Sequence, residues 1–256
     1  MVLGALDSGA GADREDAVTA GKDAREKICV ALDFPAAAEA RAFAQRLRGR
    51  CGWFKIGLEL FVSEGPGFVA EIARSGKVFL DLKLHDIPNT VAAAAKAAVR
   101  TGASLVNVHA SGGREMMAAA RAAVAEEAAR LGIERPATIA VTILTSLGGD
   151  GFAELPFSGD PSSAALALAK LAAASGLDGV VCSVAEVAAV RAANGPGFLT
   201  VVPGIRPAGA DAGDQKRIAT PRAAVEAGAS ILVIGRPVTR AADPEAAIDG
   251  IVKEIE

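Results

Sequence analysis

The chain has 256 residues, of which 51% are hydrophobic and 4% aromatic, and its formal net charge is -3. This length suits a single eight-fold α/β barrel, which takes about 250 residues. The sequence has neither a basic face pattern nor a charged tail, so nucleic acid is not an expected partner and an anionic ligand would need local groups. No apolar run is long enough to cross a bilayer and no signal-peptide pattern is present, which predicts a cytoplasmic protein without membrane contact.

The first 26 residues differ from the rest of the chain. They carry scattered charges and little apolar sequence, which predicts a flexible N-terminal extension at 1–26 before one folded domain at 27–256. Within that domain, Cys29, Cys51 and Cys182 are odd in number, lack metal-ligand spacing and lie in or beside apolar segments. We therefore expect them to be reduced core thiols.

From residue 27 onward, short β-rich runs alternate with alanine-rich helical stretches. The predicted strands are 28–32, 53–57, 78–82, 105–109, 138–143, 179–182, 199–202 and 231–235. The predicted helices lie near 36–48, 64–75, 90–101, 113–131, 161–174, 184–193, 221–227 and 244–254. Eight strands joined by helical crossovers predict a closed parallel (β/α)8 TIM barrel. A doubly wound open sheet is the alternative, but no Gly-x-Gly-x-x-Gly follows the first strand, where a dinucleotide-binding fold would place it.

The segment 81–90 places several charges at the end of the third predicted strand. Asp81 and Lys83 are two residues apart, so they should project to the same side, and Asp86 follows the strand. Lys55 is embedded in the apolar second strand, where a lysine is costly without a partner. We expect these four groups to form an alternating array that can stabilise a carbanion or deliver a proton. A lysine between two aspartates should remain an ammonium, which suits a general acid better than a Schiff-base nucleophile.

Polar residues recur at the same end of nearly every predicted strand, which is where barrels of this kind build their active sites. They are Asp33, Lys55, Asp81, Lys83, Asp86, His109, Thr145, Ser146, Arg206 and Arg236. The loops after strands seven and eight are the usual phosphate position. Gly235 would let backbone N–H groups approach an anion, and Arg236 adds a forked donor. His85 and His109 lack a zinc-binding pattern, and we expect both to have hydrogen-bonded structural roles.

Five segments together resemble bacterial orotidine 5′-phosphate decarboxylases, in order and over about residues 27–256. They are 31–33, 54–57, 81–90, 202–207 and 234–236. The Asp-x-Lys-x-x-Asp core is shared with magnesium-dependent relatives, 3-keto-L-gulonate-6-phosphate decarboxylase and hexulose-6-phosphate synthase. The continuation Ile-Pro-Asn-Thr at 87–90 and the Gly-Ile-Arg-Pro segment at 204–207 separate this chain from them.

The resemblance implies decarboxylation of orotidine 5′-monophosphate to uridine 5′-monophosphate without a metal ion or a cofactor. It implies that Lys83 protonates C6 and that Asp81 lies against the substrate carboxylate. It also implies a homodimer, because Asp86 and Thr90 would reach into the neighbouring subunit's site. The alternatives are a magnesium-dependent sugar-phosphate decarboxylase or aldolase, and a non-catalytic nucleotide-binding barrel.

The same resemblance assigns the remaining substrate contacts. Asp33 and Lys55 would bind ribose hydroxyls, and Thr145 and Ser146 would meet the pyrimidine. The phosphate would be held by Gln215, Gly235 and Arg236, with Arg206 assisting the loop over it. Ile87 and Pro203 complete the expected substrate-binding set.

Overall fold

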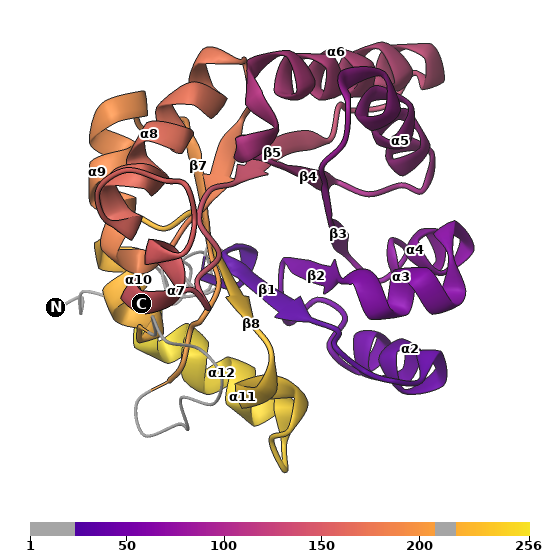
Figure 1. The fold of residues 1–256 in the computed structure, drawn as a ribbon. Coiled ribbons are helices and arrows are strands. Elements are labelled where there is room, and N and C mark those ends of the chain that lie inside the picture. Colours follow the sequence, from indigo (N-terminus) through magenta and orange to yellow (C-terminus); the bar gives the residue numbers. More distant parts are fainter. Residues whose placement is uncertain (1–23, 208–218) are drawn as a thin grey trace, which may run out of the picture.

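The computed structural model describes residues 24–207 and 219–256. Within them, eight parallel strands form a closed barrel in chain order (Figure 1). They are β1 (Ile28–Ala31), β2 (Trp53–Ile56), β3 (Lys77–Leu84), β4 (Leu105–His109), β5 (Ala137–Val141), β6 (Gly179–Val181), β7 (Leu199–Val202) and β8 (Ile231–Ile234). The predicted TIM barrel is confirmed, and β3 continues two residues beyond its predicted end.

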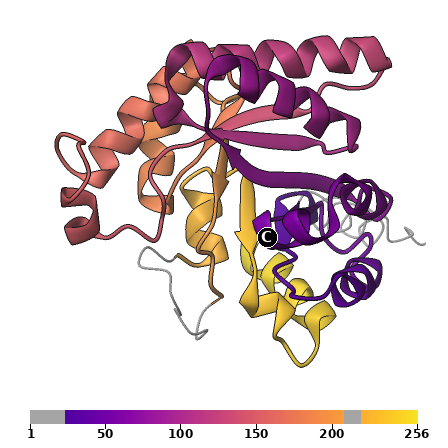
Figure 2. The ribbon, with the colours of Figure 1, turned by 45° about the vertical axis from the view of Figure 1, so that its right-hand side comes forward.

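The predicted helices are also present on the outside of the barrel, as Figures 1 and 2 show. They are α2 (Ala37–Arg46), α4 (Pro66–Ile72), α5 (Pro88–Arg100), α6 (Gly113–Leu131), α8 (Pro161–Ala174), α9 (Val184–Asn194), α10 (Pro221–Glu226) and α12 (Pro244–Ile255). Among the residues described, no helix is both long and apolar enough to cross a lipid bilayer.

Four short helical elements were not predicted. They are α3 (Leu58–Glu64), the 3-10 turn η1 (Ala110–Gly112), α7 (Gly149–Ala153) and α11 (Arg236–Thr239). The helix expected at 64–75 is α4, which begins at Pro66, and α3 ends directly before it because Gly65 adopts a positive φ of 72° and Pro66 opens the next helix. A proline in a helix interior would remove a backbone donor, so the chain restarts at this point.

Local sequence signals explain where several helices begin. Pro161 occupies the first turn of α8, and the Asp160 side chain accepts the N–H groups of Ser162 and Ser163 at 2.8 and 3.1 Å. Asp243 caps α12 in the same manner. These caps satisfy backbone donors that have no partner inside the helix.

The alternation of side chains along the strands determines which residues reach the barrel interior. In β1, Cys29 and Ala31 pack inside the barrel, whereas Ile28 and Val30 pack outward against the helices. Phe79 of β3 and Val233 of β8 also face inward. Because side chains two apart share a face, the next inward positions are Asp33, Asp81 and Gly235. The apolar interior therefore ends in a polar layer at the carboxyl ends of the strands.

Residues 1–23 of the expected extension lie outside the described residues. Residues 24–26 already contact the barrel, since the Trp53 indole donates to the Glu26 carbonyl at 3.0 Å and Arg25 pairs with Asp249 at 3.1 Å. Ala24, the first of the described residues, is itself buried.

Candidate active site

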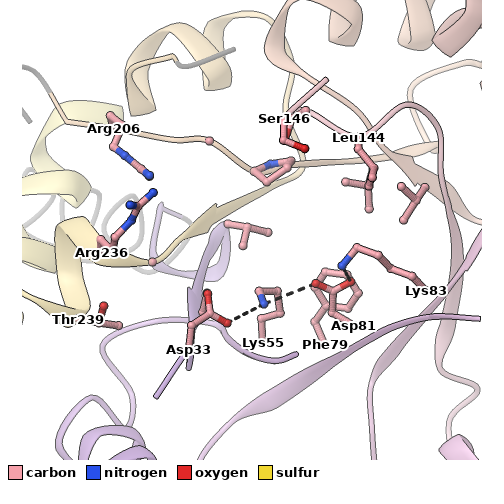
Figure 3. Close-up of a pocket in the computed structure, with 18 of the residues that line it drawn as sticks. Asp33, Lys55, Phe79, Asp81, Lys83, Leu144, Ser146, Arg206, Arg236 and Thr239 are labelled. Carbon is pink, nitrogen blue, oxygen red and sulfur yellow. Dashed lines mark hydrogen bonds and ion pairs between the residues drawn. The ribbon is translucent and has the colours of Figure 1, made fainter. Parts of the chain in front are cut away.

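A cavity of about 460 Å³ opens at the carboxyl ends of the strands. Ten of the residues expected at the site line it (Figure 3): Asp33, Lys55, Asp81, Lys83, Thr145, Ser146, Pro203, Arg206, Gly235 and Arg236. Apolar side chains, among them Phe79, Ile143 and Val233, form much of the remaining wall. The structure thus gathers residues from β1, β2, β3, β8 and the loops after β5 and β7 around one space.

Four charged side chains form a continuous series of ion pairs at one side of this cavity. Lys55 Nζ lies 3.1 Å from Asp33 Oδ1 and 3.5 Å from Asp81 Oδ2, while Lys83 Nζ lies 2.7 Å from Asp81 Oδ1 (Figure 3). The Asp81 and Lys55 side chains are only 10% and 12% exposed, whereas that of Lys83 is 32% exposed. The array therefore has a buried centre and a lysine that reaches the open cavity.

The array keeps its central members ionised. Burial acts to lower the pKa of Lys55, but the charges of Asp81 and Asp33 outweigh it, so that pKa lies above its ordinary value. Burial likewise acts to raise the pKa of Asp81, but Lys55, Lys83 and hydrogen bonds from Lys83 and Asn107 outweigh it, so that pKa lies below its ordinary value. Asp81 is therefore a carboxylate and Lys55 an ammonium at neutral pH.

Asp86 does not join the array of its own chain, which corrects one expectation drawn from the residues alone. Its carboxylate is exposed and accepts the N–H of Ile87 at 2.6 Å. Ile87 is 67% exposed, Thr90 is also exposed, and none of the three lines the cavity. Asp33, carried by the loop after β1, takes the fourth place instead. Asp86 fails to do so because it lies beyond the end of β3, where the chain turns away into α5.

The late loops form the opposite side of the cavity. Figure 3 shows the guanidinium groups of Arg206 and Arg236 turned toward the same space. Arg206 is 7% exposed, and its backbone N–H donates to the Ala219 carbonyl at 2.9 Å. A side chain at Gly235 would enter the cavity, since a Cβ there would lie 3.8 Å from Asp33 Oδ2. Gln215, the other expected phosphate contact, lies outside the described residues.

Sequence reasoning missed Asn107, Thr239 and Arg240. Asn107 is 1% exposed and donates its amide N–H to Asp81 Oδ1 at 2.7 Å. The signal for it was available, because an amide inside the apolar run 105–109 needs a partner. Thr239 and Arg240 line the cavity next to Arg236, and they were missed because the short helix α11 was not predicted.

The two histidines lie against each other, with ring centroids 5.4 Å apart. Burial, together with the neighbouring His85 and Lys83, lowers the pKa of His109. Across residues 24–207 and 219–256, no group of three or more His, Cys, Asp or Glu side chains is arranged to hold a metal ion.

Comparison with known proteins identifies the family. A sequence model of the orotidine 5′-phosphate decarboxylase / HUMPS family matches residues 26–251. Orotidine 5′-phosphate decarboxylases from Moorella thermoacetica and Halorhodospira halophila are 51% and 54% identical, over 91% and 90% of this chain and 93% and 95% of theirs. A crystal structure of the Lactobacillus acidophilus enzyme of that name superposes with a TM-score of 0.78 at 38% identity, covering 90% of this chain and 98% of that one. The chain therefore belongs to the orotidine 5′-phosphate decarboxylase / HUMPS family.

Proposed function

We propose that this protein decarboxylates orotidine 5′-monophosphate to uridine 5′-monophosphate, the last step of de novo UMP synthesis, with neither metal ion nor cofactor. The observation that carries the proposal is the Lys55, Asp81 and Lys83 array, in which the partly exposed Lys83 ammonium enters a cavity of nucleotide size. Ligand pockets span about 300–1,000 Å³, and this one holds about 460 Å³.

The chemistry requires a proton donor and fixed charges. When the bond from C6 to the carboxylate breaks, carbon dioxide leaves and its electron pair stays on C6, where no π system delocalises it. In the proposed reaction, Lys83 gives a proton to C6 and later regains one from solvent. The Asp81 carboxylate would face the substrate carboxylate, so that repulsion between like charges is relieved as carbon dioxide forms. The lysines are already oriented by ion pairs, so little reorganisation is needed as charge develops.

The phosphate is the proposed source of binding energy. Enzymes supply about 8–23 kcal/mol of transition-state stabilisation, more than one lysine contact provides. In the proposed pose, Arg236 and the Gly235 backbone hold the phosphate, assisted by Arg206 and by Gln215. Figure 3 supports this pose, because the two guanidinium groups and Lys83 lie at opposite sides of the cavity. Gripping a non-reacting group can position the pyrimidine at the array.

The remaining proposed contacts are those to the ribose and to the base. Asp33 and Lys55 would bind ribose hydroxyls, while Thr145, Ser146 and Pro203 would contact the base. All five line the cavity.

We also propose a homodimer in which Asp86, Ile87 and Thr90 complete the partner's site. Their exposure and their position outside the cavity of their own chain support this. So does the exposed apolar surface on α3, which follows the adjacent strand β2: Leu58 is 53% and Val62 79% exposed. A cytoplasmic location is part of the same proposal, and the three buried cysteines without disulfides are compatible with a reducing compartment.

The test is an ultraviolet assay of the purified protein with orotidine 5′-monophosphate in EDTA, with the product identified as uridine 5′-monophosphate. We expect the substrate absorbance to decline, at the same rate with EDTA as without it. No turnover, or turnover that EDTA abolishes, would overturn the proposal.

A further inference from the structure

Strands β3 and β4 pair irregularly beside the charge array. Leu80 pairs with Val106, and the next pairing joins Leu84 to Val108. Three residues of β3, including Asp81 and Lys83, therefore lie opposite one residue of β4, Asn107. Within this interruption Lys83 has a φ of 52°, the only positive value at a non-glycine residue among those described. Such a conformation is strained for a residue with a side chain and persists only where the surrounding structure holds it.

The Asn107 side chain spans the interruption with two hydrogen bonds. Its Oδ1 accepts the backbone N–H of Lys83 at 2.8 Å, and its Nδ2 donates to Asp81 Oδ1 at 2.7 Å. In the opposite amide orientation, the Asn107 NH2 group would face the Lys83 N–H and its oxygen would face the Asp81 carboxylate, and neither pair could form a hydrogen bond. Both partners therefore require the same orientation of the amide. One buried side chain thus holds the backbone of the proposed proton donor and the carboxylate that pairs with its ammonium.

We infer that Asn107 is a positioning residue for the decarboxylation, acting by locking Lys83 in its left-handed conformation and fixing the Asp81 carboxylate. The inference rests on the proposed function. Asp81 Oδ1 receives both the Asn107 N–H and the Lys83 ammonium, so loss of the amide would free the carboxylate to rotate. It would also leave the Lys83 N–H without its partner across the bulge. Both changes move the ammonium relative to C6, while the proposed phosphate contacts on the opposite side of the cavity stay in place.

The first test compares Asn107→Leu, which has similar volume and no polar atoms, with Thr138→Val as a matched control. Thr138 is a buried polar residue of β5 whose hydroxyl has no partner among the described residues. Losing hydrogen bonds to charged or buried groups corresponds to a fall of about 10- to 100-fold in kcat. We expect that fall for Asn107→Leu, with affinity for uridine 5′-monophosphate within about threefold of the parent. Thr138→Val should match the parent in both.

The second test separates positioning from general packing. In Asn107→Asp, the neutral carboxyl can accept the Lys83 N–H and donate to Asp81, whereas the ionised one repels Asp81. The titratable groups of this corner are Asp81 and Lys83 on β3, Lys55 on β2, and His109 with its neighbour His85; β5 presents Ile139. These groups titrate in the parent as well, so dividing the kcat of the variant by the kcat of the parent at each pH removes their contribution. The ratio should rise as pH falls, by up to about tenfold per unit.

The outcomes are distinct. A kcat for Asn107→Leu within about twofold of the parent, or a kcat ratio of Asn107→Asp to the parent that falls as pH falls, would overturn the inference. If circular dichroism shows that Asn107→Leu does not fold, the pH dependence of the kcat ratio for Asn107→Asp decides between the outcomes. Absence of turnover in both the parent and Thr138→Val would contradict the proposed function instead, so the two failures are distinguishable.

Discussion

Lys83 Nζ lies 2.7 Å from the carboxylate of Asp81, two residues earlier on the same strand. Asp81 therefore cannot be altered without changing both the charge in the proposed substrate site and the anchor of the ammonium. Burial acts to raise the pKa of Asp81, but the charges of Lys55 and Lys83 outweigh it and keep that pKa below its ordinary value. Asp81 therefore carries its negative charge at neutral pH.

Asp81→Asn should separate ground-state binding from turnover. Removing the negative charge relieves repulsion of the substrate carboxylate, so KM should stay unchanged or fall, while kcat should fall at least about 100-fold. Steady-state kinetics checks both. Asp249→Asn is the control, since Asp249 pairs with Arg25 and Arg50 at the surface. Equal kcat in the two variants would show that the charge at position 81 is not used.

Arg236→Ala should weaken phosphate recognition specifically. A lost charge-assisted hydrogen bond costs about 1.5–3 kcal/mol, or about 10- to 150-fold in affinity for uridine 5′-monophosphate. Uridine, which has no phosphate, should bind the parent and the variant equally. Calorimetric titration of both ligands measures the difference, and an equal loss for uridine would remove Arg236 from the proposed phosphate site.

Mixed dimers should recover activity that neither variant has alone. If Asp86 serves the partner's site, a dimer of one Lys83→Ala chain and one Asp86→Ala chain has one intact site. Random reassortment should then restore about a quarter of the parent activity. Mixing Lys83→Ala with Asp81→Ala is the control, because both changes lie in the array of one chain and no intact site can form. Recovery in the control, or none in the test mixture, would contradict the shared site.

Glu127 should contribute to stability in a pH-dependent manner. Hydrogen bonds from Arg130 and Arg100 lower its pKa from 4.5 to about 2. A lowered folded-state pKa means that the contribution is complete above the ordinary value and disappears as pH falls toward about 2. Glu127→Gln should therefore lower Tm at pH 7, and the difference from the parent should shrink as pH falls below 4.5. A Tm difference that is constant with pH would exclude this role.

The barrel could be predicted because its signals are local. Runs such as 28–31 and 231–234 are apolar and bounded by turn residues, and their alternation with alanine-rich helices gives the topology directly. The polar residues at the strand ends could be read in the same way. The signals that end α3 at Gly65 and begin α4 at Pro66 are equally local, although α3 was not predicted.

The details that the sequence did not provide depend on contacts between strands. Pairing of Lys55 with Asp33 requires the register in which Ala31 lies opposite Lys55. The left-handed conformation of Lys83 depends on the interrupted pairing with β4 and on Asn107. Simple strand alternation places Asp81 and Lys83 on one side but contains no information about either feature.

The most direct test of the central claim is the turnover of orotidine 5′-monophosphate by Lys83→Ala in EDTA, measured beside the parent and Lys96→Ala, a lysine paired with Glu126 on the helical surface. A general acid contributes about 100- to 10,000-fold. Turnover should fall by at least that much in Lys83→Ala and remain unchanged in Lys96→Ala, while all three proteins bind uridine 5′-monophosphate. Undiminished turnover in Lys83→Ala would contradict the assignment of Lys83 as the proton donor.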